Sequence, residues 1–457
     1  MQKVMDRIDE LIESYRTEMT ETLKELVRIP SVREPAQPDA PFGPNVRDCL
    51  TKALALSERF GLKPQNIDNF AGHSDIGEGD ATIGILVHLD VVPVGENWTM
   101  PPFEAIERDG KIWGRGASDN KAACVETWFA LKALQEAGVS FKKKIRVIYG
   151  CDEESLWEDM KYYKEHVKMP DFGYVPDGTF PLTNAEKGIL HFDISIPSKG
   201  DDLRILSLVG GERPNVVLAR SEMSLSGEIA APTDDEAISI VVKNGNTKIV
   251  SEGIAAHGSS PEMGKNAGVK LMCYLKRAGL VGNMIDFVSR MFSDFTGEAL
   301  GIQFEDEASG KLTMNLGALN KQDDKFIATV DIRYPVTMDY DALKNCIERK
   351  LQEYGATMTV RDHKLPLYLP KDHPVVTTLL RVYESCTGVH GEAESTGGGT
   401  YARAMYNAVA YGPGVKDGPD HHCHNADEWV GIDEMIQACK IYAHTILALQ
   451  DISVANW

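Results

Sequence analysis

The stretch GILVHLDVVPVG, residues 84–95, decides the fold of this 457-residue chain. Residues 83–87 are apolar or small and contain no turn signal, which is typical of a strand buried on both faces of a sheet. The run ends on His88 and Asp90, whose side chains should leave the same face because side chains alternate along a strand. A carboxylate beside a histidine commonly fixes the ring of a metal ligand. The stretch therefore predicts one corner of a metal site.

Length and composition predict a soluble protein of two domains. A chain of 457 residues exceeds one ordinary core, and its 43% hydrophobic and 25% charged residues are typical of globular proteins. The net charge of −20 argues against nucleic acid and anionic membranes as partners. The charged N-terminal segment resembles no signal peptide, and no long uncharged apolar run predicts a membrane span. Eight scattered cysteines without CxxC spacing indicate reduced thiols, so we expect a cytoplasmic protein.

The first 180 residues alternate between helical and strand patterns. Helical periodicity over residues 4–27 predicts one long opening helix, and a second helix is expected over 46–60. The dipeptide Asp109-Gly110 predicts a hairpin. Residues 144–150 predict another buried strand. This alternation is the pattern of an α/β domain.

Carboxylates follow these strands at the ends where open α/β sheets bind ligands. Glu153 and Glu154 come directly after residues 144–150, and Asp177 follows the next short strand. Adjacent carboxylates repel each other unless a cation lies beside them. Asp119 precedes a predicted helix; alone, it would be read as a helix N-cap. Together these acids predict a cation site.

The pattern changes near residue 181 and returns to α/β near residue 374. We expect a doubly wound α/β catalytic domain formed by residues 1–182 and 375–457, with an inserted α+β lid domain over residues 183–374. Within the insertion, a helix is expected near residues 215–220.

The collected candidates form a nitrogen and oxygen ligand set. They include a histidine from the HHCHN cluster, in which His421, His422 and His424 compete. Such a set suits Zn²⁺, Mn²⁺ or Co²⁺ in an open site. Five ligands exceed the need of one catalytic ion, and a carboxylate bridging two ions would use them all.

The motifs HLDVVPVG, GxxDNK, DEES, PDG and HNADE resemble, in this order, the two-metal aminoacylase/dipeptidase superfamily of metallopeptidases. The likeness is greatest to the PepV-type bacterial dipeptidases and extends to DEESLWEDMKYYKEH, AEKGI, GGGTYAR and DIRYP. The resemblance implies that His88 and Asp177 hold one ion, Glu154 and His424 hold the other, and Asp119 bridges them. Asp90 would orient His88, and Glu153 would be the general base and acid for attack by a bridging hydroxide.

The resemblance also implies substrate-binding residues in the insertion. His257, in AAHGSSP, would stabilise the oxyanion together with Asn215. Arg333, in DIRYP, would bind the substrate carboxylate through its planar fork, although an ion pair with Asp331 is the alternative. The glycine run around Gly398 lacks the Gly-Lys-Ser/Thr that would follow in a phosphate-binding loop, so we expect it to line the substrate pocket.

The sequence departs from the family pattern at Asn120, where Asp is frequent, and at Ala122, where Gly is common. Neither change removes a ligand. We expect a metal-dependent dipeptidase acting on dipeptides with a free amine and carboxylate. The alternatives are an N-acyl amino acid deacylase of the acetylornithine or succinyl-diaminopimelate type and a non-catalytic amino-acid or peptide sensor. The long insertion favours a monomer, since dimeric relatives carry a smaller one.

Overall fold

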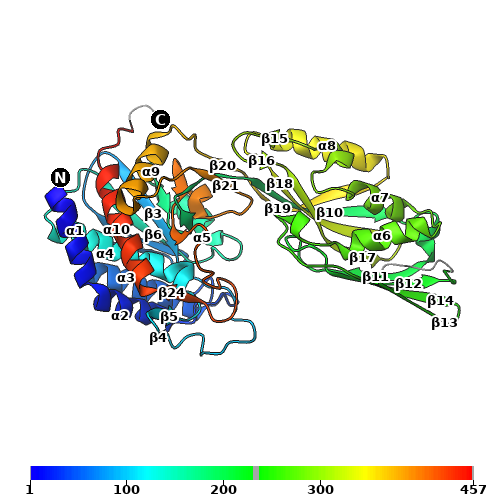
Figure 1. The fold of residues 1–457 in the computed structure, drawn as a ribbon, viewed down its shortest axis with the longest axis horizontal. Coiled ribbons are helices and arrows are strands. Elements are labelled where there is room, and N and C mark those ends of the chain that lie inside the picture. Colours follow the sequence, from blue (N-terminus) through cyan, green and yellow to red (C-terminus); the bar gives the residue numbers. More distant parts are fainter. Residues whose placement is uncertain (1, 230–235, 455–457) are drawn as a thin grey trace. The chain divides into compact units, whose positions relative to one another are not determined.

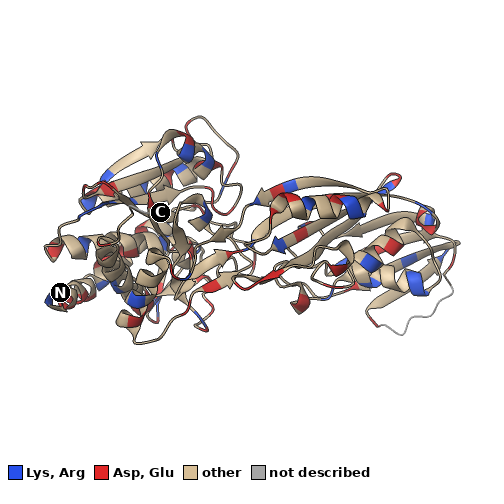
Figure 2. Ribbon diagram, turned by 90° about the horizontal axis from the view of Figure 1, so that it is seen from above, with Lys and Arg blue, Asp and Glu red and all other residues tan. Residues whose placement is uncertain are grey.

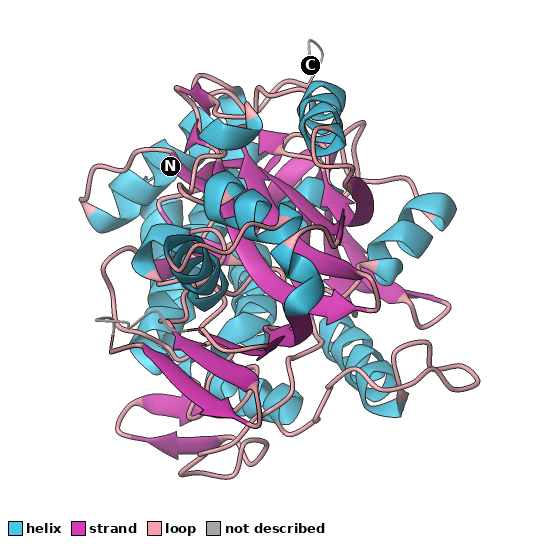
Figure 3. Ribbon diagram, turned by 90° about the vertical axis from the view of Figure 1, so that its right-hand side faces the viewer, coloured by secondary structure: helices cyan, strands magenta, loops and turns pink. Residues whose placement is uncertain are grey.

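The structure, a computed structural model, describes residues 2–229 and 236–454 and separates into two compact units (Figure 1). The first unit comprises Met1–Asn184, Leu369–Glu394 and Gly399–Trp457. The second comprises Ala185–Tyr368 and the short segment Ser395–Gly398. Helices and strands both occur in the molecule (Figure 3), and each unit contains both (Figure 1), so the α/β class predicted from the sequence is confirmed.

The sheet of the first unit has a parallel centre. Its strands run in the order β1 (Lys63–Ile67), β2 (Ala71–Ile76), β6 (Lys144–Gly150), β3 (Thr82–His88), β7 (Phe172–Val175) and β22 (Ala408–Ala410). From β6 to β22 each neighbouring pair is parallel, whereas β2 pairs with β6 and β1 with β2 in the antiparallel sense. The carboxyl ends of β6, β3 and β7 therefore meet at one edge of the sheet.

Helices cover this sheet and form the larger of two cores. They are α1 (Gln2–Ser14), α2 (Arg16–Val27), α3 (Pro44–Arg59), α4 (Ala122–Glu136), α5 (Glu158–His166), α9 (Pro374–Thr387) and α10 (Ile432–Leu449). The expected single opening helix was wrong, because the chain turns at Tyr15 and divides it into α1 and α2. Helix α4 packs against α10, and α1 contacts both. Ile83, Ile85 and Val87 of β3 belong to the same core as the buried residues of α4.

Close packing explains the glycine in the opening stretch. Gly84 of β3 pairs with Gly173 of β7, and a Cβ added at Gly173 would lie 1.8 Å from the carbonyl oxygen of Gly84. A Cβ added at Gly84 would lie 2.7 Å from Sδ of Met405. Interiors packed at this density leave no room for a methyl group. The two glycines therefore allow β3 and β7 to approach closely, next to the sheet edge where His88 and Asp177 lie.

Shorter elements complete the first unit. Strands β4 (Ile106–Arg108) and β5 (Lys111–Trp113) form the hairpin predicted at Asp109-Gly110, and β5 also pairs with β24 (Trp429–Gly431). The others are η1 (Ala117–Lys121), η5 (Tyr401–Ala404), β8 (Gly178–Phe180) and β23 (Pro413–Val415). Strands β9 (Thr183–Glu186), β20 (Leu367–Tyr368) and β21 (Glu394–Thr396) lie where the chain passes between the units.

In the described part of the second unit, residues 185–229, 236–368 and 395–398, the chain forms two four-stranded sheets and three helices. One sheet has the order β17 (Thr313–Gln322), β18 (Lys325–Tyr334), β10 (Gly188–Pro197) and β19 (Thr357–Lys364). The other has the order β11 (Ile205–Gly210), β12 (Arg220–Ser226), β14 (Asn246–Glu252) and β13 (Ile238–Lys243). The helices are α6 (Ala267–Arg277), α7 (Asn283–Met291) and α8 (Tyr340–Gln352), and the short elements are η2 (Asp201–Arg204), η3 (Pro261–Met263), η4 (Glu298–Leu300), β15 (Glu305–Asp306) and β16 (Gly310–Lys311).

The expected helix near residues 215–220 was wrong. This segment is irregular, and β12 begins at Arg220. The second unit has its own core, in which Phe192 and Ile194 of β10 cluster with residues of α6 and α7. Acidic and basic residues are distributed over both units (Figure 2). Among the described residues, no helix combines the length and apolar character needed to cross a membrane.

Candidate metal centre

The predicted acidic residues lie at one edge of the sheet of the first unit. His88 is the last residue of β3, Glu153 and Glu154 follow β6, and Asp177 follows β7. Since the three strands are parallel neighbours, their carboxyl ends bring these side chains together. Asp119 joins them from η1, the turn that leads into α4.

Asp119 lies between two histidines. Its Oδ1 is 3.0 Å from Nε2 of His88, and its Oδ2 is 3.1 Å from Nε2 of His424. Nε2 of His424 is also 2.9 Å from Oε1 of Glu154. Each oxygen of Asp119 thus faces a different histidine, which is the arrangement that a carboxylate shared by two cations requires.

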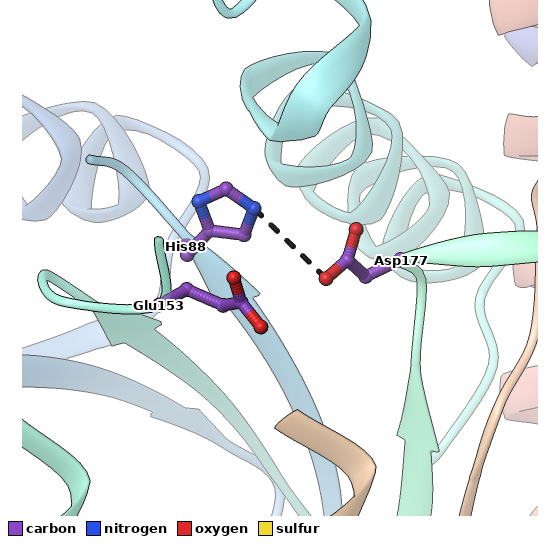
Figure 4. A group of neighbouring side chains, drawn as sticks. All are labelled: His88, Glu153 and Asp177. Carbon is purple, nitrogen blue, oxygen red and sulfur yellow. Dashed lines mark ion pairs between the residues drawn. The ribbon is translucent and has the colours of Figure 1, made fainter. Parts of the chain in front are cut away.

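Two overlapping groups of ligand atoms are close enough to hold ions. His88, Asp119 and Glu154 form one, and His88, Glu153 and Asp177 form the other, with the ligand atoms of each group within 4.8 Å of one another. Figure 4 shows the second group, in which the side chains of Glu153 and Asp177 lie near the His88 ring and a dashed line joins His88 to Asp177. Nε2 of His88 lies 3.9 Å from Oδ2 of Asp177. Next to this centre, a cavity of about 310 Å³ is lined by Asp119, Asp177 and other residues of the first unit.

Burial and charge perturb the site strongly. Burial, together with the nearby charge of Asp177, raises the pKa of Glu153 well above its usual value. Burial alone would also raise the pKa of Asp119, but its hydrogen bonds with His424 and His88 outweigh burial and lower it. The hydrogen bonds of His424 with Asp119 and Glu154 raise its pKa to about 10. The raised pKa of His424 and the lowered pKa of Asp119 show that the carboxylates of the centre stabilise a cation next to them.

Asp90 contacts both the histidine and the segment that carries the glutamates. Strand β3 ends at His88, so Asp90 lies beyond the strand. Nδ1 of His88 lies 2.9 Å from the backbone carbonyl oxygen of Asp90 and 3.6 Å from its Oδ1. The carboxylate of Asp90 accepts the backbone N–H groups of Glu153 and Glu154, each at 3.1 Å. Asp90 therefore holds the His88 ring through its main chain and the two glutamates through its side chain.

Of the three neighbouring histidines, His424 is the one that contacts the acidic cluster. Nε2 of His421 instead lies 3.0 Å from Oε2 of Glu434, and its ring packs edge-on against Trp429.

Sequence reasoning assigned no role to two residues that support the centre. Asn120, which follows a cis peptide bond after Asp119, accepts the backbone N–H of His88 at 3.3 Å and donates to the backbone carbonyl of Pro176 at 2.5 Å. It thereby joins the ends of β3 and β7. Glu428 accepts the backbone N–H groups of Gly116 and Asp119, in and next to η1. Glu428 stands in the HNADE motif, whereas the backbone contacts of both residues have no recognisable sequence pattern.

The residues predicted to bind substrate in the second unit form a cluster of their own. The N–H of Gly258 donates to the carbonyl of Asn215 at 2.8 Å, and Val216 forms an antiparallel bridge with His257. The backbone N–H of Ser259 donates to Nδ1 of His257 at 3.2 Å. Because an N–H group can only donate, Nδ1 is an acceptor and the neutral ring carries its proton on Nε2. Burial, followed by the charge of Arg333, lowers the pKa of His257, which favours that neutral form.

Arg333 forms the ion pair that was the alternative to a substrate contact. Its Nε and Nη2 donate to the two carboxylate oxygens of Asp331 at 2.8 and 2.9 Å. Its Nη1 donates to the carbonyl oxygen of Gly397 at 2.8 Å, which joins Arg333 to the glycine run containing Gly398. A substrate carboxylate at Arg333 would therefore share the guanidinium with Asp331.

Comparison with known proteins identifies the family. The family model "Peptidase family M20/M25/M40" matches residues 84–448, and the chain belongs to this family of peptide hydrolases. The Bacillus subtilis (strain 168) protein named "Putative dipeptidase YtjP" is 37% identical over 448 residues, which cover 93% of this chain and 96% of the relative. A Staphylococcus saprophyticus protein with the same type of name is 32% identical over 463 residues, which cover 96% of this chain and 98% of the relative. The predicted resemblance to a metallopeptidase superfamily is thus confirmed, and the family implies divalent metal ions.

Solved structures share the fold. Human carnosine dipeptidase 1 aligns with a TM-score of 0.62 at 14% identity, over 98% of this chain and 99% of that structure. The dipeptidase Dug1p from Saccharomyces cerevisiae aligns with a TM-score of 0.62 at 13% identity, over 99% and 100% of the two chains. At such low identity, these likenesses establish a common architecture.

Proposed function

We propose that this chain is a metal-dependent dipeptidase that hydrolyses dipeptides with a free amine and a free carboxylate. The observation that carries the proposal is the carboxylate of Asp119 between His88 and His424, with Glu153 beside Asp177. Family membership gives peptide hydrolysis, and the names of the relatives with at least 30% identity point to dipeptides.

The residues of the centre fit two divalent cations. Four carboxylates converge on two histidines, and such crowding is costly unless cations lie among them. We assign His88 and Asp177 to one ion, Glu154 and His424 to the other, and Asp119 to both. Nitrogen and oxygen donors suit Zn²⁺, our first choice, and also Mn²⁺ or Co²⁺. When bound, the ions act as Lewis acids that polarise the scissile carbonyl and acidify water.

The side chains supply proton transfer and orientation. Glu153 takes the proton of the attacking water and returns it to the nitrogen of the leaving amine. Asp90 keeps His88 oriented and holds the backbone of Glu153. We assign the Nε2–H of His257, with Asn215, to the oxygen that develops negative charge. Arg333, whose charge is partly balanced by Asp331, and the backbone around Gly398 are assigned to the substrate carboxylate end.

The composition of the chain supports a proposal about its compartment and its partners. We propose a monomer in the cytoplasm, with small peptides as its partners and with no role in binding nucleic acid or membranes. The net charge of −20 opposes binding to polyanions. The eight cysteines without CxxC spacing suit a reducing compartment.

A substrate panel with added metal tests the proposal. The purified chain is stripped with a chelator and reloaded with Zn²⁺, Mn²⁺ or Co²⁺. It is then assayed on Ala-Ala-type dipeptides, a tripeptide, and N-acetyl and N-succinyl amino acids, with the stripped protein as the control. We expect hydrolysis of free dipeptides only in the reloaded protein.

The other outcomes are distinct. If only acylated amino acids are hydrolysed, the proposed metal centre stands, but the enzyme is a deacylase and not a dipeptidase. Absence of all hydrolysis with metal bound would indicate a non-catalytic amino-acid or peptide sensor.

A further inference from the structure

Two buried carboxylates hold four consecutive backbone N–H groups directly after β6. This segment, Cys151–Glu154, is called the carboxylate loop because it carries Glu153 and Glu154. Oδ2 of Asp159 accepts the N–H groups of Cys151 and Asp152 at 2.7 and 3.1 Å. Asp90 accepts the next two, those of Glu153 and Glu154. Asp90 and Asp159 are 1% and 0% exposed, so water does not compete for these hydrogen bonds.

Tyr401 supports the same loop from another part of the chain. Its hydroxyl donates to Oδ2 of Asp159, the oxygen that already accepts two N–H groups of the loop. The side chain of Tyr401 is fully buried, at 0% exposed. The hydroxyl therefore adds a third donor to one carboxylate oxygen and fixes where that carboxylate lies.

The ring of Tyr401 contacts the elements on both sides of the loop. It packs edge-on against Trp157, with ring centroids 5.0 Å apart, and lies perpendicular to the ring of His88 at 6.3 Å. A Cβ added at Gly150, the last residue of β6, would lie 2.3 Å from Cε2 of Tyr401. The indole N–H of Trp157 in turn donates to the carbonyl of Glu153 at 2.8 Å. Because the Tyr401 ring packs against residues on both sides of the carboxylate loop, the loop cannot move unless this ring moves too.

We propose that Tyr401 and Asp159 are positioning residues that set the carboxylates of Glu153 and Glu154 for proton transfer and metal binding. The inference rests on the roles proposed above for those two glutamates. Neither Tyr401 nor Asp159 is assigned contact with substrate or metal; each acts through the backbone of the carboxylate loop. Misplacement of a reacting group by about 1 Å can lower a rate about a hundredfold, so a hydroxyl that fixes this loop should be visible in turnover.

The test compares Tyr401→Phe with a matched control, Tyr442→Phe. Tyr442 is also fully buried in the first unit, and its hydroxyl donates to the carbonyl of Tyr411 at 3.1 Å, away from the carboxylate loop. Each substitution removes one buried hydroxyl together with its hydrogen bonds, so both variants should lose stability. A second variant, Asp159→Asn, keeps the side-chain shape but weakens the acceptor for the loop.

Three quantities are measured for each protein: kcat and KM on a free dipeptide, Zn²⁺ affinity by competition with a chromogenic chelator, and stability by denaturant unfolding. We expect Tyr401→Phe to lower kcat about tenfold to a hundredfold with KM changed less than about threefold, and to weaken Zn²⁺ binding by up to about tenfold. Asp159→Asn should act in the same direction. Tyr442→Phe should lose similar stability with wild-type kcat and Zn²⁺ affinity.

Wild-type kcat and Zn²⁺ affinity in a folded Tyr401→Phe protein would overturn the inference. If Tyr401→Phe does not fold, the same two quantities in Asp159→Asn decide. Failure of the proposed function is recognised separately, because the wild-type protein would then bind Zn²⁺ without hydrolysing dipeptides. In that case a Zn²⁺ affinity lowered in Tyr401→Phe but not in Tyr442→Phe would still support the positioning of Glu154.

Discussion

The backbone N–H of Asp119 donates to Oε1 of Glu428 at 3.0 Å, although 309 positions separate the two residues. The same carboxylate accepts the N–H groups of Ser118 and Gly116 at 3.0 and 2.9 Å and forms an ion pair with Arg115 at 2.7 Å. Glu428 is 0% exposed and lies four residues after His424 in the sequence. It therefore fixes the turn that presents Asp119 to the two histidines.

We predict that Glu428→Gln lowers both stability and metal affinity. The substitution leaves the buried Arg115 without its anionic partner and brings an amide NH₂ against backbone donors, which should cost about 3 kcal/mol. Displacement of Asp119 should weaken Zn²⁺ binding about tenfold or more. Denaturant unfolding and competitive Zn²⁺ titration measure the two effects. Glu434→Gln, at a more exposed carboxylate, is the control. Wild-type Zn²⁺ affinity in Glu428→Gln would contradict the role.

The general base gives a second prediction, for Glu153→Gln. We expect kcat to fall about a hundredfold to ten-thousandfold, because glutamine cannot carry a proton between water and the amine, while Zn²⁺ affinity changes little. Stopped-flow or steady-state hydrolysis and Zn²⁺ competition provide the measurements. Glu158→Gln, at an exposed glutamate that pairs with Arg33, should keep its turnover. Loss of a Zn²⁺ ion in Glu153→Gln would instead make Glu153 a ligand with His88 and Asp177, in line with the proximity of their ligand atoms.

Metal removal should destabilise the protein. The substitution Asp177→Asn should have opposite effects on Tm in the metal-free and the Zn²⁺-loaded protein. Bound ions stabilise by about 4 kcal/mol at a free concentration a thousand times the dissociation constant. Without metal, burial and then the charge of Asp177 raise the pKa of Glu153, so Asp177 disfavours the charged form of Glu153. Asp177→Asn should therefore raise the Tm of the chelator-treated protein and lower the Tm of the Zn²⁺-loaded protein relative to wild type.

Thermal unfolding with and without chelator measures the two Tm changes and shows whether they have opposite signs. Asp171→Asn is the control: Asp171 directly precedes β7 and pairs with Lys168, so the Tm of this variant should differ from that of wild type by the same amount with and without Zn²⁺. If Asp177→Asn lowered both Tm values equally, Asp177 would be structural and not a ligand.

Much of the fold could be predicted because its signals are local. The strand over residues 144–150 is rich in β-branched and aromatic residues, which favour strands, and contains no turn residue before its end. The hairpin at Asp109-Gly110 is marked by its turn residues. The break at Tyr15 was not predictable from periodicity, because the apolar positions continue through it. The expected helix near residues 215–220 failed because tertiary packing can override local propensity in so short a segment.

The candidate ligands were also predictable, since carboxylates after parallel strands meet at one sheet edge. Their supports were not predictable. Glu428, Asp159 and Asn120 act on backbone N–H and carbonyl groups, which every residue carries and no motif marks. Tyr401 reaches Asp159 from 242 residues away, so only the folded chain reveals the contact.

The pH dependence of stability gives a last prediction, at the contact between α1 and α10. Nε2 of His444 lies 2.8 Å from Oδ1 of Asp9. Burial lowers the pKa of His444, but the interactions with Asp9 and Cys386 together outweigh burial, and the pKa rises to about 9. A histidine whose pKa is higher in the folded than in the unfolded chain stabilises fully below its unfolded pKa of about 6.5. That contribution is lost as the pH rises through about 9.

We therefore expect Asp9→Asn to lower the free energy of unfolding by about 1 kcal/mol at pH 6, a value kept small because Asp9 is 41% exposed. The difference from wild type should shrink between pH 7 and pH 9 and vanish near pH 10, where His444 is neutral in both states. Urea unfolding at pH 6, 8 and 10 measures it. Asp6→Asn, on the same helix but hydrogen-bonded to Gln2, controls for the change in net charge. A difference that stayed constant up to pH 10 would show that the contact stabilises by packing, because a charged His444 can contribute only below its folded pKa.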